Sequence, residues 1–186
     1  TLMMLGIKDI LIISTPEDTP HIMNHFKDGS DYGINIEYKI QQEPKGIAEA
    51  FVLGEDFIGD DNVTLILGDN IFYLGSQIND IANRIKQEKE KSIIFGYHVT
   101  DPERFGVIEF DDNENVISIE EKPKKAKSNY AAVGLYFFQN DVVEKVKNQK
   151  PSERGELEIT DVSNAFLNEK RLDVINFKRG SAWLDA

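Results

Sequence analysis

Continuous apolar runs alternate along the first half of the chain with segments whose apolar residues recur at helical spacing. The runs at 10–13 and 63–67 are typical of strands buried on both faces of a sheet. The pattern predicts strands at 10–13, 34–38, 63–67 and 92–97, with helices at 15–26, 47–53 and 77–90. Strands and helices in this alternation favour a right-handed, mostly parallel sheet.

The rhythm changes after residue 100. Two strand-like segments, 105–110 and 116–120, flank the polar stretch 111–115, which is a hairpin signature. The remaining pattern predicts strands at 130–138 and 173–177 and helices at 142–146 and 157–167. We therefore expect an α/β fold of Rossmann-like type, with a mixed, mostly parallel central sheet and flanking helices.

Both ends of the chain have the pattern of interior segments. Residues 1–6 read as the last turn of an apolar helix capped by Gly6, and one turn is too short to be stable alone. At the other end the chain stops with residues 183–186, just after a strand-like stretch and with no closing element. We expect residues 1–186 to form a single domain fragment whose fold is incomplete at both termini.

Composition limits the classes of partner. The chain has 186 residues, 21 Lys+Arg and 33 Asp+Glu, for a formal charge of −12. This charge argues against broad binding to nucleic acid or to an anionic membrane, because both require a positive surface. The absence of cysteine excludes disulfides and thiolate metal sites, and it favours the cytoplasm. No apolar run approaches the ~20 residues of a membrane-spanning helix.

One acidic residue stands where ligands bind in open α/β sheets, beyond the carboxyl end of a strand. Asp69 follows the apolar run 63–67 directly after Gly68. A carboxylate there suits Mg²⁺, which takes one or two carboxylates together with substrate phosphates. The alternative is an Asx turn or a helix cap. Asp185, beside Trp183, is a second candidate carboxylate, and nothing in the sequence pairs it with Asp69.

Three further segments carry candidate chemistry. The 41–48 loop contains a glutamine that can read a base edge and Gly46, which permits close backbone approach. Glu121 and Lys122 end a hairpin strand that the following proline stops. Arg154 precedes a helix, where a guanidinium and backbone N–H groups can share a phosphate. Taken singly, each has a structural alternative: a β–α loop, a solvated charge pair and a helix start.

The order of the motifs discriminates better than any one of them. QQEPKGIA at 41–48, LGDN at 67–70 and DPERFGV at 101–107 are followed by EEKP at 120–123, SNYA at 128–131, RGELEITD at 154–161 and WLD at 183–185. In this order they resemble the glucose-1-phosphate thymidylyltransferase (dTDP-glucose pyrophosphorylase) family of sugar nucleotidyltransferases. The resemblance covers nearly the whole chain.

The resemblance implies roles for individual residues. Asp69 and Asp185 would bind Mg²⁺, and the catalytic residues would be Asp69, Lys122 and Arg154. The nucleotide-binding residues would be Gln41, Gly46 and Ile47. The sugar-phosphate-binding residues would be Phe105, Gly106, Glu121, Lys122, Ala132, Tyr136 and Arg154. Residues 1–100 would form the nucleotide-binding part and 101–186 the sugar-phosphate-binding part.

The implied reaction is Mg²⁺-dependent transfer of dTMP from dTTP to glucose 1-phosphate, giving dTDP-glucose and pyrophosphate for deoxysugar and polysaccharide biosynthesis. A homo-oligomer is implied for the full-length protein, with neither nucleic acid nor membrane as a partner. Two departures stand out: Phe105 replaces a common Tyr, and Ala132 with Val133 replaces the usual Val-Thr. The family's Gly-rich loop and catalytic Lys are not in these 186 residues, so we expect the isolated chain to be inactive or nearly so.

Two alternatives remain open from the sequence. The first is a related nucleotidyltransferase that uses UTP or CTP. The second is a module that binds or senses nucleotide-sugars without catalysis. A metal-dependent glycosyltransferase is disfavoured, because such enzymes tend to carry an Asp-x-Asp motif after the strand. Here Asp69 is followed by Asn70 and Ile71. Hydrolase, NTPase and dinucleotide-binding motifs are absent.

Overall fold

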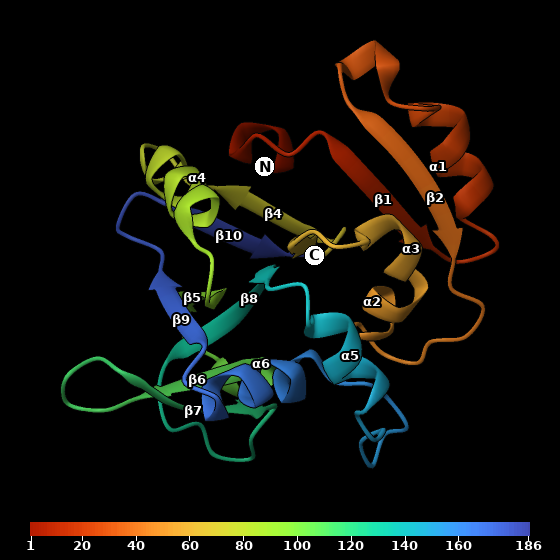
Figure 1. Cartoon of the computed structure of the whole chain (residues 1–186). Coiled ribbons are helices and arrows are strands. Elements are labelled where there is room, and N and C mark those ends of the chain that lie inside the picture. The colour runs from red at the N-terminus through yellow and green to blue at the C-terminus, as the bar shows by residue number, and fades with distance from the viewer.

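The computed structural model describes all 186 residues, Thr1–Ala186, and contains three sheets (Figure 1). The first pairs β1 (Asp9–Ser14) with β2 (Asn35–Ile40), and a second pairs β4 (Asn70–Tyr73) with β10 (Ala182–Asp185). The central sheet has the order β7 (Val116–Glu121), β6 (Gly106–Phe110), β8 (Tyr130–Phe138), β5 (Ser92–His98) and β9 (Leu172–Asn176), with β3 (Val63–Ile66) also paired to β8.

Helices surround the sheets. They are α1 (Thr19–Phe26), α2 (Glu49–Leu53), α3 (Glu55–Ile58), α4 (Gln77–Gln87), α5 (Val142–Lys147) and α6 (Ile159–Asn168), with short 3₁₀ turns at Leu2–Leu5, Ser30–Tyr32 and Pro102–Arg104. The spacing of Ile78 and Ile81 gives α4 one apolar face, which is buried as the sequence predicts. No helix combines the length and the apolar content that crossing a bilayer requires.

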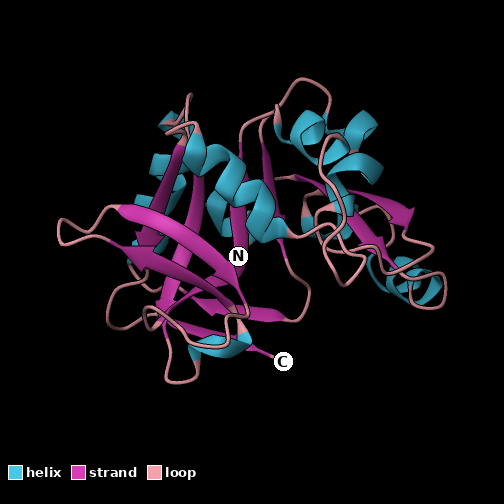
Figure 2. Ribbon diagram, turned by 90° about the horizontal axis from the view of Figure 1, so that it is seen from below, coloured by secondary structure: helices cyan, strands magenta, loops and turns pink.

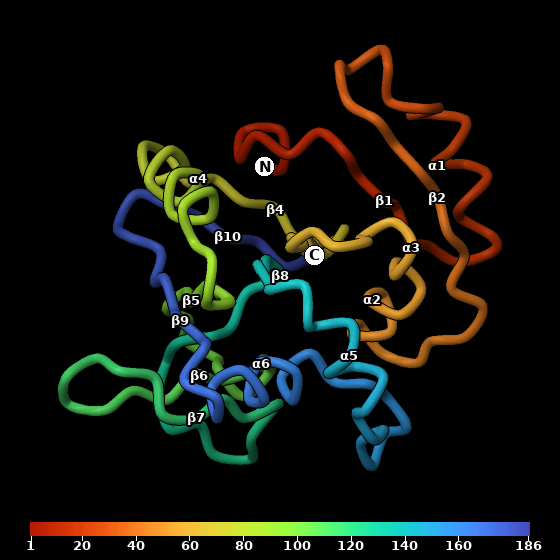
Figure 3. The backbone as a smooth tube through the Cα atoms, viewed as in Figure 1, coloured from red at the N-terminus to blue at the C-terminus, as the bar shows by residue number.

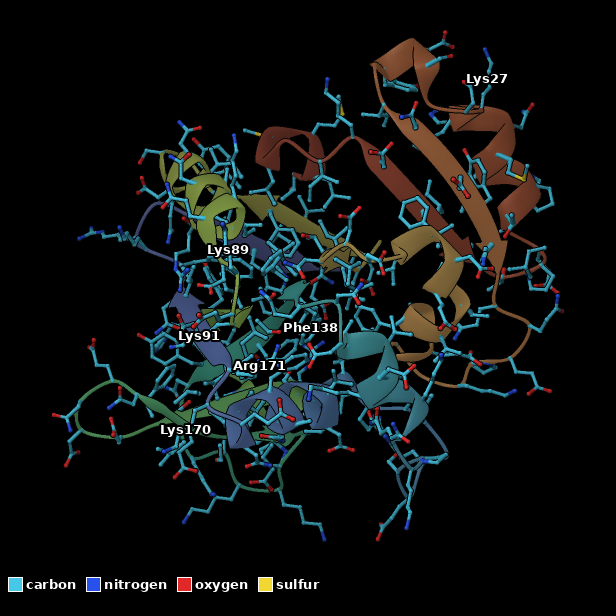
Figure 4. The ribbon with its side chains drawn as sticks, in the orientation of Figure 1. Lys27, Lys89, Lys91, Phe138, Lys170 and Arg171 are labelled. Carbon is cyan, nitrogen blue, oxygen red and sulfur yellow. The ribbon has the colours of Figure 1, made fainter.

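The central sheet is buried on both faces. Along β8, Val133 and Leu135 pack toward α4 and Trp183, whereas Tyr136 and Phe138 pack with α2, α5 and α6. Phe138 lies in the interior of the molecule (Figure 4). Two-sided burial explains why β5 and β8 are almost continuously apolar and do not alternate.

The β1–β2 pair is less enclosed than the central sheet. It lies with α1 at one side of the molecule, in both viewing directions (Figures 1 and 2). The pairing is parallel, as expected, but β1 is half-buried along most of its length despite its apolar run. Lys27, directly after α1, extends at the periphery of this part.

The mixed α/β class with flanking helices is confirmed, and the direction of the strand pairs corrects one detail. Only β1–β2 and β5–β9 are parallel, while the other five pairs are antiparallel. The reason is the position of β8, which runs opposite to β3, β5 and β6 and pairs with all three. The strand–helix alternation of the first half therefore does not produce a parallel majority.

The β4–β10 pair is absent from the sequence-based expectation. Each strand has only four residues, and β4 starts at an asparagine, a residue disfavoured in strands. The backbone trace brings β10, from the end of the chain, back beside β4 (Figure 3). In the register of this pair Asp185 lies opposite Asn70, which brings Asp185 close to the segment that carries Asp69.

Candidate active site

Two carboxylates from distant parts of the chain meet on one amide group. Nδ2 of Asn70 donates a 2.8 Å hydrogen bond to Oδ1 of Asp69 and another of 2.8 Å to Oδ1 of Asp185. Both aspartates are exposed to solvent. We call Asp69 and Asp185 the acid pair. The β4–β10 register therefore brings together the two acids that the sequence alone does not connect.

Asn70 itself is a functional candidate that sequence reasoning did not single out. Its side chain is buried, and Oδ1 accepts hydrogen bonds from the backbone N–H of Gly134 at 3.0 Å and from Nε1 of Trp183 at 2.6 Å. The only signal in the sequence is its position directly after Asp69. Its four partners come from three separate segments, so they become visible only in the folded chain.

The acid pair fits a hard divalent cation. Mg²⁺ is usually bound by one or two carboxylates, with phosphate oxygens and water completing the coordination. The chain has no cluster of three or more His, Cys, Asp or Glu residues suited to a metal. A divalent cation held by the acid pair would therefore need further ligands beyond these two side chains.

An aromatic contact connects β10, the strand that carries Asp185, to the residues beside Lys122. The ring of Phe105 packs edge-on against Trp183, with 5.1 Å between centroids. The carbonyl of Phe105 accepts a 3.0 Å hydrogen bond from the backbone N–H of Lys122. Lys122 has a φ of 42°, a left-handed conformation that L side chains rarely adopt. Its side chain is exposed at the end of β7.

Glu121 is oriented by a threonine that the sequence argument included only as part of a motif. The hydroxyl of Thr160 donates a 2.6 Å hydrogen bond to Oε2 of Glu121, and Thr160 is itself buried. Gly106 is paired with Glu121 across the hairpin. A Cβ at Gly106 would lie 3.2 Å from the Thr160 hydroxyl oxygen and 3.7 Å from Cβ of Ala132. The missing side chain thus leaves Glu121 and Thr160 room to meet.

Arg154 is surrounded by carboxylates. Its guanidinium forms a bidentate pair with Glu158, with two contacts of 2.9 Å, and it lies 3.6 Å from Glu156 and 3.9 Å from Oε1 of Glu121. The hydrogen bond to Glu158 is the main reason that the pKa of Arg154 is raised. Any anion that binds to this guanidinium would have to compete with Glu158.

The loop that carries Gln41 and Gly46 docks on the segment after Arg154. Gly46 has a φ of +100°, and a Cβ there would lie 2.5 Å from the carbonyl oxygen of Leu157. Nε2 of Gln41 donates to the carbonyl of Gly46 at 3.3 Å and to Glu49 at 2.7 Å. Ile47 is exposed. The close approach that Gly46 permits is therefore to the protein's own backbone.

Tyr136 belongs mainly to the core. Its side chain is 5 % exposed and its ring stacks on Phe138, with 5.9 Å between centroids. Burial raises its pKa far above the ordinary range, and the charges of Glu121 and Asp185 raise the pKa further. The ring is therefore part of the core, while its hydroxyl lies in the electrostatic field of Glu121 and Asp185.

Comparison with known proteins identifies the family. The model of the nucleotidyl transferase family matches residues 1–186. The chain belongs to this family. Among its relatives, a glucose-1-phosphate thymidylyltransferase of Neisseria gonorrhoeae is 50% identical over 184 residues, which cover 99% of this chain and 64% of the relative. One of Mycolicibacterium smegmatis is 48% identical over 185 residues, covering 100% and 64%. This nucleotidyl transferase chain thus spans just under two thirds of the length of these relatives.

Solved structures agree with the fold. A crystal structure of a Bacillus anthracis protein, provisionally named a glucose-1-phosphate thymidylyltransferase and complexed with sucrose, has a TM-score of 0.90 and 38% identity. It covers 100% of this chain, which spans 73% of it. A UDP-glucose pyrophosphorylase complexed with UDP-glucose has a TM-score of 0.81 at 24% identity, covering 99% of this chain and 77% of its own, and shows the fold alone.

Proposed function

We propose that this nucleotidyl transferase acts on sugar phosphates and transfers dTMP from dTTP to glucose 1-phosphate, giving dTDP-glucose and pyrophosphate. The observation that carries the proposal is the acid pair, held together on the amide of Asn70. The names of the relatives support the choice of substrates. The whole-chain family match supports the reaction type.

The acid pair would hold Mg²⁺. When bound, this ion neutralises charge that accumulates on the phosphates in the transition state. Lys122 and Arg154 would neutralise the remaining charge on the phosphates, because a chain with a net negative charge needs cations placed at the site itself. Lys122 is exposed at a strand end, and Arg154 lies 3.9 Å from Glu121, so both cations border the carboxylate expected to bind sugar.

No general base is required in this reaction. A sugar phosphate oxygen is already anionic at neutral pH, so the protein must chiefly align it with the α-phosphorus of the nucleotide. Glu121, oriented by Thr160, would accept hydrogen bonds from sugar hydroxyls. The surface for the sugar would be completed by Phe105, Gly106, Ala132 and the hydroxyl of Tyr136.

Nucleotide contacts would come from the 41–48 loop within residues 1–100, and sugar-phosphate contacts from residues 101–186. The Gln41 amide offers one donor and one acceptor, which suits the edge of thymine. In the structure its donor is directed to Gly46 and Glu49, so base binding requires the amide to exchange partners.

Turnover tests the proposal. Pyrophosphate release is measured with glucose 1-phosphate and dTTP, UTP or CTP, using the protein at its natural length and the 186-residue chain in parallel. We expect Mg²⁺-dependent release with dTTP from the former, and little or none from the latter. Dominant use of UTP or CTP would overturn the nucleotide assignment. Binding of dTDP-glucose without turnover at natural length would instead favour a nucleotide-sugar-binding module.

A further inference from the structure

We propose that Asn70 is a positioning residue that holds Asp69 and Asp185 in one arrangement before a cation binds, an inference that rests on the metal site of the proposed function. Its amide lies between the two carboxylates and donates to one oxygen of each, at 2.8 Å in both cases. The other oxygen, Oδ2, of each aspartate receives no hydrogen bond from the chain. Each acid therefore keeps one oxygen available to a cation.

The orientation of the amide is determined by its opposite side. Oδ1 of Asn70 accepts from the Gly134 N–H at 3.0 Å and from Trp183 Nε1 at 2.6 Å. Turning the amide over would place NH₂ against these two donors, so only one orientation satisfies all four groups. A Cβ at Gly134 would lie 2.5 Å from Oδ1 of Asn70, which shows how closely the backbone of β8 supports it.

A purely structural role for Asn70 does not explain the two hydrogen bonds that its side-chain NH₂ donates. The contacts to Gly134 and Trp183 already tie β4 to β8 and β10, and they satisfy buried groups. The two N–H groups are directed at exposed carboxylates, which water would otherwise solvate. Their effect is to hold two like charges on a common donor, whose N–H groups offset part of the repulsion between them before the cation arrives.

Groups that orient metal-binding side chains typically change metal affinity by 10- to 100-fold when removed. The first experiment measures Mn²⁺ binding to the protein by the loss of the free-ion electron paramagnetic resonance signal. We expect Asn70→Ala to weaken Mn²⁺ binding about tenfold or more. The matched control is Asn164→Ala, because Asn164 exchanges two hydrogen bonds with the backbone of Ile119 and touches no acid. The control variant is expected to bind Mn²⁺ like the wild type.

A second measurement needs no variant and decides the matter if Asn70→Ala does not fold. The chain has one tryptophan, so the indole N–H resonance of ¹⁵N-labelled protein belongs to Trp183 without ambiguity. On titration with Mg²⁺ we expect this resonance and the side-chain NH₂ resonances of Asn70 to shift with one common midpoint. Magnesium binding that leaves the Asn70 NH₂ resonances unmoved would overturn the proposal.

The outcomes separate the two proposals. If the folded Asn70→Ala variant binds Mn²⁺ as tightly as the wild type, the positioning role is wrong and the metal site stands. If the wild type does not bind Mn²⁺, or binds it equally well after Asp69→Asn, then the metal site of the proposed function is wrong and the role of Asn70 is wrong with it.

Discussion

The acid pair and the Arg154 segment, residues 154–161, are assembled over very different distances along the chain. Asp185 meets Asn70 across 115 positions, through the β4–β10 pair. Arg154 meets Glu158 only four positions away. A one-residue slip in the β4–β10 register would turn Asp185 to the other face of its strand, whereas the Arg154–Glu158 pair would persist.

We call the acid pair and the Arg154 segment the two halves of the site. The difference shows that the acid pair is the half that depends on the complete fold. The acid pair is a product of long-range register, and the cation of the Arg154 segment is a product of local chain geometry. The Arg154 segment also has long-range supports, namely the docking of Gly46 on Leu157 and the hydrogen bond from Thr160 to Glu121. Perturbing the two halves separately should therefore give different signatures.

The largest effect is expected at the acid pair. In the protein at natural length, Asp69→Asn should lower the rate of pyrophosphate release on the order of 10²–10³, because a preorganised charge contact to the transition state is lost. Asp185→Asn should behave alike. Asp101→Asn is the control, since Asp101 is an exposed carboxylate paired with Arg104. Near-normal turnover in either acid-pair variant would contradict the assignment.

The next largest effect tests the docking of the 41–48 loop. We expect Gly46→Ala to lower the free energy of unfolding by about 3 kcal/mol in urea denaturation, combining left-handed strain with a clash. Gly33→Ala is the matched control: its φ is +70° and its ψ is 29°, which is left-handed, but a Cβ there meets nothing within 4 Å, so only the strain of about 1–2 kcal/mol should remain. Equal losses in the two variants would show that the contact with Leu157 is unimportant.

A smaller effect is expected in the Arg154 segment. Arg154→Ala should raise KM for glucose 1-phosphate roughly 10- to 100-fold, the equivalent of one or two charged hydrogen bonds. Arg154→Lys keeps the charge but loses the fork that binds two oxygens at once, so it should recover only part of the affinity. Mn²⁺ binding should stay unchanged in both variants. A loss of Mn²⁺ binding would show that the two halves are not independent.

The smallest effect on the site is expected from Glu88, which lies outside both halves and affects how stability depends on pH. Burial alone would raise the pKa of Glu88, but the backbone N–H groups of Glu90 and Lys91, together with Arg84, outweigh it and lower the pKa to about 2. Because the folded pKa lies below the ordinary value of 4.5, this carboxylate stabilises the fold above pH 4.5. Its contribution is lost as the pH falls toward 2.

Glu88→Gln should therefore flatten the dependence of the urea midpoint on pH between 4.5 and 2, while both halves of the site keep their neutral-pH properties. The comparison needs the midpoint of wild type and variant at several pH values in that window. An unchanged slope would mean that other carboxylates dominate acid unfolding.

Regular elements could be predicted wherever one local signal was strong. The helix at α4 follows from the spacing of Ile78 and Ile81, and the strand at β8 from nine largely apolar residues. Local patterns do not encode strand direction, so the antiparallel pairing of β8 was not predictable. The short β4 and β10 strands were missed because four residues carry too little periodicity.

The candidate site residues could be identified from the sequence, but the residues that they contact could not. Asp69, Lys122 and Arg154 stand at strand ends or before a helix, positions that the pattern identifies. Thr160 contacts Glu121 across 39 positions, and Asn70 contacts Asp185 across 115 positions. Such contacts depend on packing between elements, which no local pattern specifies.

The amino-acid sequence by itself determined the α/β class, the main elements, the acidic character and the ordered motifs that indicate the family. Only the tertiary structure decided that Asp69 and Asp185 share one amide, and that Gly46 serves a backbone contact. The physical reason is that helical and strand periodicity act over a few neighbouring residues. Register, in contrast, is a cooperative property of strands brought together from distant parts of the chain.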